Sequence, residues 1–138
     1  MNRHRWLGAA AAALLALLTL SGCSSGAGAS TSGAEDGRYE IAFATSPAEL
    51  KLNESVTLSV AVSRGGKPVK DADVVLELWP KGVEPSEHAQ LSAKADGKGS
   101  YVLKGQFSQA GVYYVISHVT PKETGQMTMA GFEFEIVP

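Results

Sequence analysis

The chain has 138 residues, and the first 22 have the composition of an export signal, which leaves 116 residues for the mature protein. That length is enough for one domain and excludes a multidomain enzyme. Without Arg3 and Arg5 of the signal, ten basic residues face fourteen acidic ones, a formal charge of −4, so nucleic-acid binding is not expected. Cys23 is the sole cysteine, which excludes an intramolecular disulfide and a zinc site of paired cysteines. Any metal must therefore be held by histidine, methionine or carboxylate.

The N-terminal segment, residues 1–22, has the charge pattern of a secretory signal. Arg3, His4 and Arg5 form a basic start, and residues 6–20 carry no charge. At about 1.5 Å per residue these apolar residues span about 22 Å, which is short of the roughly 30 Å hydrocarbon core of a bilayer. The segment is therefore interpreted as an export signal and not as a transmembrane anchor.

The sequence Leu20-Ser21-Gly22-Cys23 resembles the lipobox of bacterial lipoproteins. The resemblance implies that Cys23 becomes the first residue and carries a diacylglycerol thioether and an N-acyl chain such as palmitate. Two or more chains provide the stable anchoring that one chain does not. Residues 23–37 are then the lipidated cysteine and a flexible Gly/Ser/Ala linker. We expect a protein anchored by lipid on the extracytoplasmic face of the cell membrane.

Residues 38–138 form the predicted folded domain, in which runs of residues alternate between apolar and polar with period two. Gly, Pro, Asn and Asp residues bound these runs, as expected for turns. The predicted strands lie near residues 39–43, 56–62, 74–79, 88–93, 101–107, 112–119 and 127–137. Short strands at this spacing predict an all-β antiparallel sandwich of about seven strands.

Several motifs along this domain resemble the YtkA-like domain family, which is related to the FixH group. They are GKPVKDADV (66–74), LWP (78–80), GSY (99–101), GVY (111–113) and HV (118–119). The resemblance implies an immunoglobulin-like β-sandwich and, more loosely, a link to copper handling or cytochrome oxidase assembly. A membrane protein such as an oxidase or a copper transporter is the partner that it implies.

Two histidines and two methionines are the candidate metal ligands of the mature chain. They are His88, His118, Met127 and Met129. Imidazole and thioether groups suit copper, especially Cu(I), so copper is the candidate cofactor. On the last strand the large apolar residues are even-numbered, which directs Met127 and Met129 away from the core.

The pairing of the last two strands decides whether His118 meets these methionines. If the odd-numbered residues 113–119 face the core, His118 lies opposite Met127 or Met129, with Cβ atoms about 4.5–5.5 Å apart. If the even-numbered residues face the core, His118 turns inward. A three-residue turn at Gly125 or a bulge at Gly131 would also change the parity. The odd-numbered and the even-numbered residues of this strand are both apolar sets, so the sequence leaves open which of them faces the core.

We do not expect an enzyme, because the sequence has neither a Gly-x-Ser-x-Gly elbow nor a metalloprotease motif. Paired carboxylates at residues 71 and 73 or 84 and 87 lie near turns, as solvated charges do. Trp79, beside Pro80 at a strand end, is expected to seal the sandwich. The first hypothesis is a lipoprotein whose domain captures or hands over copper. The alternative is a module at the cell surface that binds a protein or wall component without a metal.

Overall fold

The computed structural model describes residues 37–138, in which every regular element is a strand except one short 3-10 helix. In chain order the elements are β1 (Tyr39–Ser46), β2 (Leu50–Lys51), β3 (Val56–Arg64), β4 (Lys67–Pro68), β5 (Ala72–Pro80), the 3-10 helix η1 (Pro85–Glu87), β6 (Ala89–Ser92), β7 (Lys94–Ala95), β8 (Ser100–Gly105), β9 (Gly111–Pro121) and β10 (Thr128–Val137). No helix within residues 37–138 is long and apolar enough to cross a membrane. The predicted signal peptide, Cys23 and the linker up to residue 36 lie outside the described residues.

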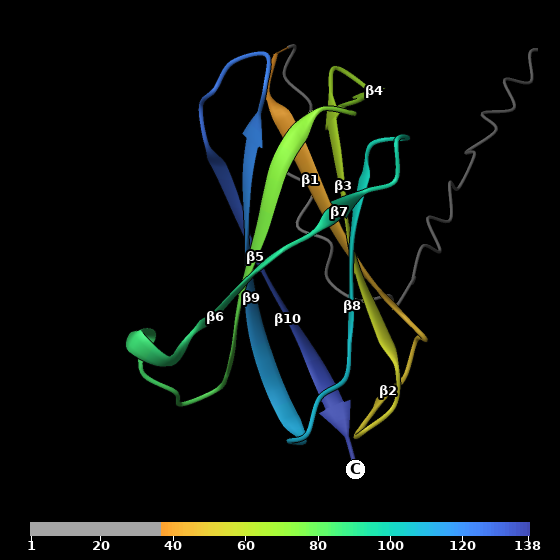
Figure 1. Ribbon diagram of the computed structural model, residues 1–138, viewed down its shortest axis with the longest axis vertical. Helices are drawn as coiled ribbons and strands as arrows, with labels where there is room; N and C mark the ends of the chain where they lie inside the picture. Colours follow the sequence, from red (N-terminus) through yellow and green to blue (C-terminus); the bar gives the residue numbers. More distant parts are fainter. Residues whose placement is uncertain (1–36) are drawn as a thin grey trace, which may run out of the picture.

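The strands form two sheets that pack face to face (Figure 1). Sheet A has the order β1-β3-β8-β7, with β4 paired to β3, and sheet B has the order β2-β10-β9-β5-β6. Strands β1, β3, β8 and β7 occupy the places of immunoglobulin strands A, B, E and D, and β5, β9 and β10 those of C, F and G. The predicted all-β immunoglobulin-like sandwich is confirmed. The structure adds short strands that periodicity did not resolve, namely β2, β4 and a separate β7.

The core lies between the sheets and is built from alternate residues of the long strands. On β3, β5 and β9 every second side chain is buried, so each strand has one inner and one outer face. The members of the main cluster are Leu58, Val60, Val62, Val74, Leu76, Leu78, Tyr101, Val115 and Val119. Because β9 buries its odd-numbered residues, its even-numbered residues lie on the outer face of sheet B.

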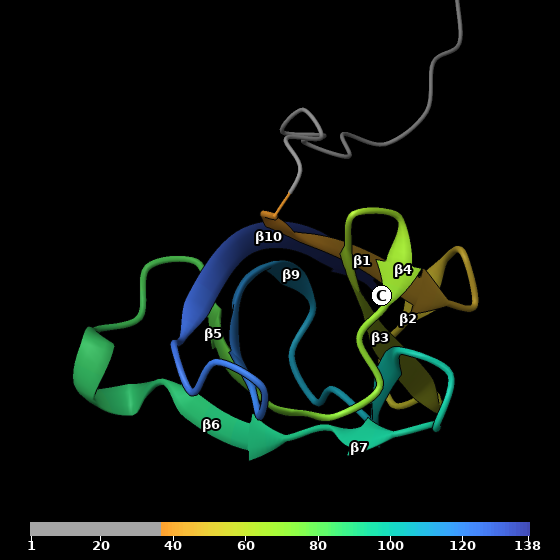
Figure 2. The ribbon, with the colours of Figure 1, turned by 90° about the horizontal axis from the view of Figure 1, so that it is seen from above.

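Strand β10 follows the predicted alternation, with its even-numbered aromatic residues turned toward the core. The Phe132 ring stacks on Phe43 of β1 at a centroid distance of 5.2 Å, and Phe134 lies 5.9 Å from the same ring. These contacts join the edge of sheet A to the edge of sheet B. In Figure 2, β1 and β10 meet along one side of the sandwich, and the continuous segment of β6 and β7 runs along the opposite side.

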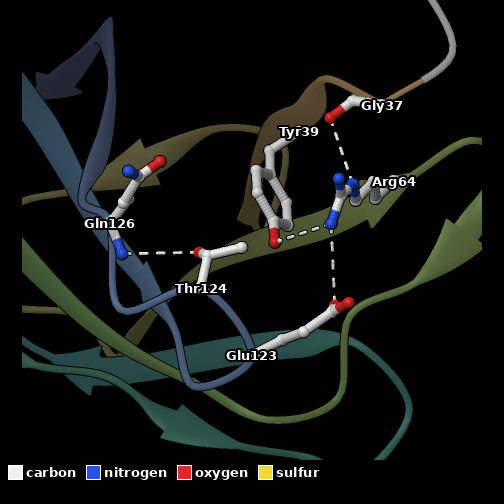
Figure 3. A network of polar contacts seen from close by, with 6 residues as sticks. All are labelled: Gly37, Tyr39, Arg64, Glu123, Thr124 and Gln126. Atoms are coloured by element: carbon white, nitrogen blue, oxygen red, sulfur yellow. Dashed lines mark hydrogen bonds and ion pairs between the residues drawn. The ribbon is translucent and has the colours of Figure 1, made fainter.

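A polar network around Arg64 ties the start of β1 to the loop between β9 and β10 (Figure 3). Its guanidinium donates to the Gly37 carbonyl oxygen at 3.0 Å and to the Tyr39 hydroxyl at 3.4 Å, and it lies 5.1 Å from the centre of the Tyr39 ring. The same side chain makes an ion pair of 3.7 Å with Glu123. The chain therefore enters the fold beside the loop that leads to β10.

We expect truncation of the core to cost far more stability than the same truncation at the surface. Leu76 is fully buried, whereas Leu91 on the neighbouring strand is 45% exposed. Leu76→Ala should lower the free energy of unfolding by about 2–5 kcal/mol. Leu91→Ala, the matched control, should lower it by about 1 kcal/mol or less. Chemical denaturation would measure both, and equal losses would contradict the placement of the core.

Candidate functional site

His118 lies on the outer face of sheet B, directly opposite Met129. Strands β9 and β10 pair with His118 against Met129 and Val119 against Thr128, without an intervening bulge. This register agrees with the alternative in which the odd-numbered residues of β9 face the core. The ring of His118 is partly open to solvent, with 20% of the side chain exposed. The inward-facing alternative for His118 is therefore wrong.

His118 and Met129 form the type of antiparallel pair in which the two side chains lie closest together. Val112 accepts a backbone hydrogen bond from Lys81, so even-numbered residues of β9 direct their backbone groups toward β5 and away from β10. His118 and Met129 are thus a non-hydrogen-bonded pair, in which opposed side chains approach most closely. Met129 is 62% exposed. An imidazole and a thioether therefore lie side by side on an open surface.

Met127 lies one residue before β10 and pairs with no strand among the described residues, and 60% of the residue is exposed. The loop that carries it is held at several points. The Lys122 ammonium makes an ion pair with Asp73 of β5, and the Gly125 amide donates to the Pro121 carbonyl at 2.8 Å. The Gln126 amide donates to the Thr124 hydroxyl, as Figure 3 shows. These contacts keep Met127 near the His118 end of the face.

Glu77, on the outer face of β5, joins the two candidate histidines through one carboxylate. One oxygen lies 2.8 Å from Nε2 of His118 and the other lies 2.7 Å from Nδ1 of His88. The Glu77 side chain is 18% exposed, and that of His88 is 9% exposed. The structure thus brings His88 and His118 to one face of sheet B, bridged by a residue that the sequence analysis did not single out.

The bridge determines the charge of Glu77 and the proton positions on both rings. Hydrogen bonds from His88 and then from His118 hold the pKa of Glu77 below its usual 4.5. An ionised carboxylate only accepts hydrogen bonds, so Nδ1 of His88 and Nε2 of His118 must carry protons. In the neutral imidazole of His118 the lone pair is then on Nδ1, which has no hydrogen-bond partner among the described residues.

His88 is fixed more tightly than His118. Its ring stacks on Trp79, with centroids 4.0 Å apart and planes 5° from parallel, and Trp79 also contacts Tyr114 at 5.9 Å. Nε2 of His88 is buried without a hydrogen-bond partner among the described residues. Trp79 therefore packs on the outer face of sheet B, and the expectation that it seals the sandwich is wrong, because Leu76 and Leu78 occupy the inner face of β5.

The signal for Glu77 was present but incomplete in the sequence. Leu76 and Leu78 point inward, so alternation alone places Glu77 and Trp79 on the outer face. Their meeting with His118 depends on the register of β5 against β9, which joins residues 41 positions apart. No local pattern reports that register.

Within residues 37–138 no group of three or more histidine, cysteine, aspartate or glutamate side chains could hold a metal ion. The Glu77 bridge is accordingly a hydrogen-bonded cluster, and its carboxylate oxygens are occupied by ring N–H groups. A metal on this face would need the methionine sulfurs as donors beside His118.

Residues 33–118 match the YtkA-like family. The chain belongs to this family. Two solved structures share its fold at 18% sequence identity. The soluble domain of PmoD from Methylocystis sp. ATCC 49242 (Rockwell) has a TM-score of 0.51, with 70% of this chain and 90% of that chain covered. An engineered protein has a TM-score of 0.53, with 73% of this chain and 20% of that chain covered. A comparison with curated proteins gives no match.

We expect Glu77→Gln to reduce stability in a pH-dependent way. The folded pKa of Glu77 lies below 4.5, so its stabilisation is fully present above that pH and is lost as the pH falls toward the folded value. Near neutral pH the variant should lose about 1–3 kcal/mol of unfolding free energy. The difference from the wild type should shrink below pH 4.5 in denaturation curves measured across pH.

Glu84→Gln is the matched control, because Glu84 is exposed and its side chain makes no cap hydrogen bond at η1. This control should leave stability within about 0.5 kcal/mol of the wild type. A Glu77→Gln effect that stays constant down to pH 3 would contradict the bridge.

Proposed function

We propose that this YtkA-like protein is an extracytoplasmic lipoprotein, anchored through Cys23, whose domain binds copper on the outer face of sheet B. His118 supplies the imidazole, Met129 the first thioether and Met127 the second. The activity is capture or hand-over of the ion, without an enzymatic step.

The observation that carries the proposal is an imidazole held by a carboxylate and set directly opposite a thioether. Metal-binding histidines nearly always donate their second ring N–H to a carboxylate, a carbonyl or water, which fixes the tautomer and orients the ring. Glu77 does this for His118 at 2.8 Å and leaves Nδ1 as the donor atom. Imidazole with two thioethers is a donor set that suits Cu(I).

The exposure of the methionines supports exchange of the ion. Met127 is 60% exposed and Met129 62% exposed, so a copper ion would reach both sulfurs without opening the core. Transfer to another protein needs an accessible ion, and a closed site would oppose it. An open face of soft donors therefore fits hand-over better than permanent storage.

His88 takes an indirect part in this proposal. Its Nδ1 is bound to Glu77 and its Nε2 is buried, so direct ligation would require the stack on Trp79 to open. His88 instead fixes the second oxygen of Glu77 and so helps to orient His118.

We expect Cu(I) binding to depend on His118 and on the two sulfurs. The test uses the Cys23→Ser chain, because a free thiol at residue 23 would itself bind Cu(I). Competition with a Cu(I) chelator should show tight binding that His118→Ala abolishes. Glu77→Gln should weaken it about 10–100-fold, as loss of an orienting partner does. Met129→Leu should weaken the binding of Cu(I) more than the binding of Cu(II), since thioether is a soft donor.

His88→Phe is the control for this series, because an aromatic ring can still stack on Trp79 while the imidazole is lost. It should reduce affinity less than His118→Ala. Competition that His118→Ala leaves unchanged would overturn the copper site.

We expect the lipid anchor to depend on Cys23. In cells, the wild-type chain should sediment with membranes, and Cys23→Ser should release the protein into the soluble extracytoplasmic fraction, because acyl chains provide the membrane affinity. Ser24→Ala is the matched control. Retention of Cys23→Ser on membranes at the wild-type level would contradict the anchor.

A further inference from the structure

Sheet B has a free strand edge along most of β10. Within residues 37–138 this strand pairs with β9 from Thr128 to Ile136, and on its other side with β2 only at Ile136 and Val137. The Val137 carbonyl accepts from the Leu52 amide on that side, so alternate residues of β10 direct their backbone groups the same way. The N–H and C=O groups at positions 129, 131, 133 and 135 therefore face the free edge.

The neighbouring edge belongs to β1, which pairs with no described strand other than β3. A groove of about 1350 Å³ lies along the two edges. Figure 2 shows β1 and β10 side by side there. Its apolar lining includes Phe43, Phe132 and Phe134, whose rings contact one another across the two strands. The groove thus offers both backbone hydrogen-bonding groups and an aromatic surface.

The lining of this groove is strongly acidic. Among residues 37–138 the lining contains Glu40, Glu49, Glu133 and Glu135 and no lysine or arginine. Glu49 makes an ion pair with Lys51 at 3.4 Å, whereas Glu133 and Glu135 make none with the described residues. Glu133 and Glu135 thus place negative charge beside the aromatic surface of the groove, without an ion pair in the part of the chain that the structure describes.

Strand β10 lacks several of the features that usually protect an edge strand. Natural edges are shielded by charged side chains, especially lysine, by proline, by bulges or by a covering segment. Residues 128–135 contain no lysine, proline or bulge, and their charged residues are Glu133 and Glu135. At Gly131 an added Cβ atom would meet nothing within 4 Å, so the outer face of β10 is open at this position.

We propose that this groove binds an extended segment of a partner protein, in which lysine or arginine alternates with apolar residues, as an added strand along β10. Strand addition obtains affinity from main-chain hydrogen bonds and specificity from alternate side chains. Glu133 and Glu135 lie on one face of β10, about 7 Å apart along the strand, which matches basic residues two positions apart. Phe132 and Phe134 lie on the other face and match the apolar residues.

Charge argues against two other occupants. The segment that precedes the fold, residues 24–36, has no basic residue and ends in Glu35 and Asp36. A second copy of the chain would bring the same glutamates to the same edge. Like charges across an interface are unfavourable, so a basic partner is the occupant that the groove favours.

The experiment uses the full chain with a peptide of about six residues that alternates valine and lysine. We expect saturable binding by fluorescence anisotropy and slowed hydrogen exchange at the Gly131, Glu133 and Glu135 amides. Amides at positions 130, 132 and 134, already bonded to β9, should change little. A peptide that alternates valine and glutamate should not bind.

The variant test reverses the charge at the groove. Glu133→Lys with Glu135→Lys should weaken binding of the lysine peptide at least about tenfold, through loss of two opposite-charge pairs, and should permit binding of the glutamate peptide. Glu84→Lys with Glu87→Lys makes the same change in net charge away from the groove and should leave binding within about twofold. Cu(I) affinity is a separate readout and does not decide this proposal.

Three results would overturn the proposal. The first is failure of the lysine peptide to bind, or equal binding by both peptides. The second is protection of the β10 edge amides without peptide that deletion of residues 24–36 removes, which would assign the edge to the chain's own segment. The third is protection that grows with protein concentration, which would assign it to a second copy.

Discussion

The burial of one face of β9 is the constraint on which the outer surface of sheet B depends. Val115 and Val119 are fully buried between β5 and β10, so the register on both sides is set by the core and not by the exposed residues. A slip of one residue would expose those valines and bury His118, at the cost of both apolar burial and an unsatisfied imidazole. The position of the outer-face residues is therefore a consequence of packing on the inner face.

On the outer face of sheet B, Glu77 fixes the orientation of two histidine rings. It lies diagonally between His118 and His88, and its two oxygens are shared between them. One carboxylate therefore orders two rings from separate elements, and Trp79 holds the second ring in place. The arrangement leaves His118 as the ring with an accessible nitrogen, so His118 can bind a ligand. The His88 ring, stacked on Trp79, is held in place and keeps the Glu77 carboxylate fixed.

The sequence was sufficient for the fold because strand alternation and turn residues are local signals. Alternation also placed Phe132 and Phe134 on the face of β10 opposite to Met129, as the structure has them. It could not choose the inner face of β9, because Ser117 and His118 each interrupt an apolar set. The structure buries Ser117, whose small hydroxyl is less costly to bury than an imidazole. Glu77 escaped prediction because only the long-range pairing of β5 with β9 brings it to His118.

The contacts of Arg64 show at which end of the sandwich the chain enters the domain. Gly37, the first described residue, and Glu123, in the loop that leads to Met127, are both held by the same guanidinium. The polypeptide thus joins the sandwich at the pole where the exposed sulfurs lie, while the C-terminus leaves at the opposite pole (Figure 1). For a chain attached to a bilayer through its N-terminal side, the soft donors would lie at the end of the domain nearer to the point of attachment, and the C-terminus would lie at the end farther from it.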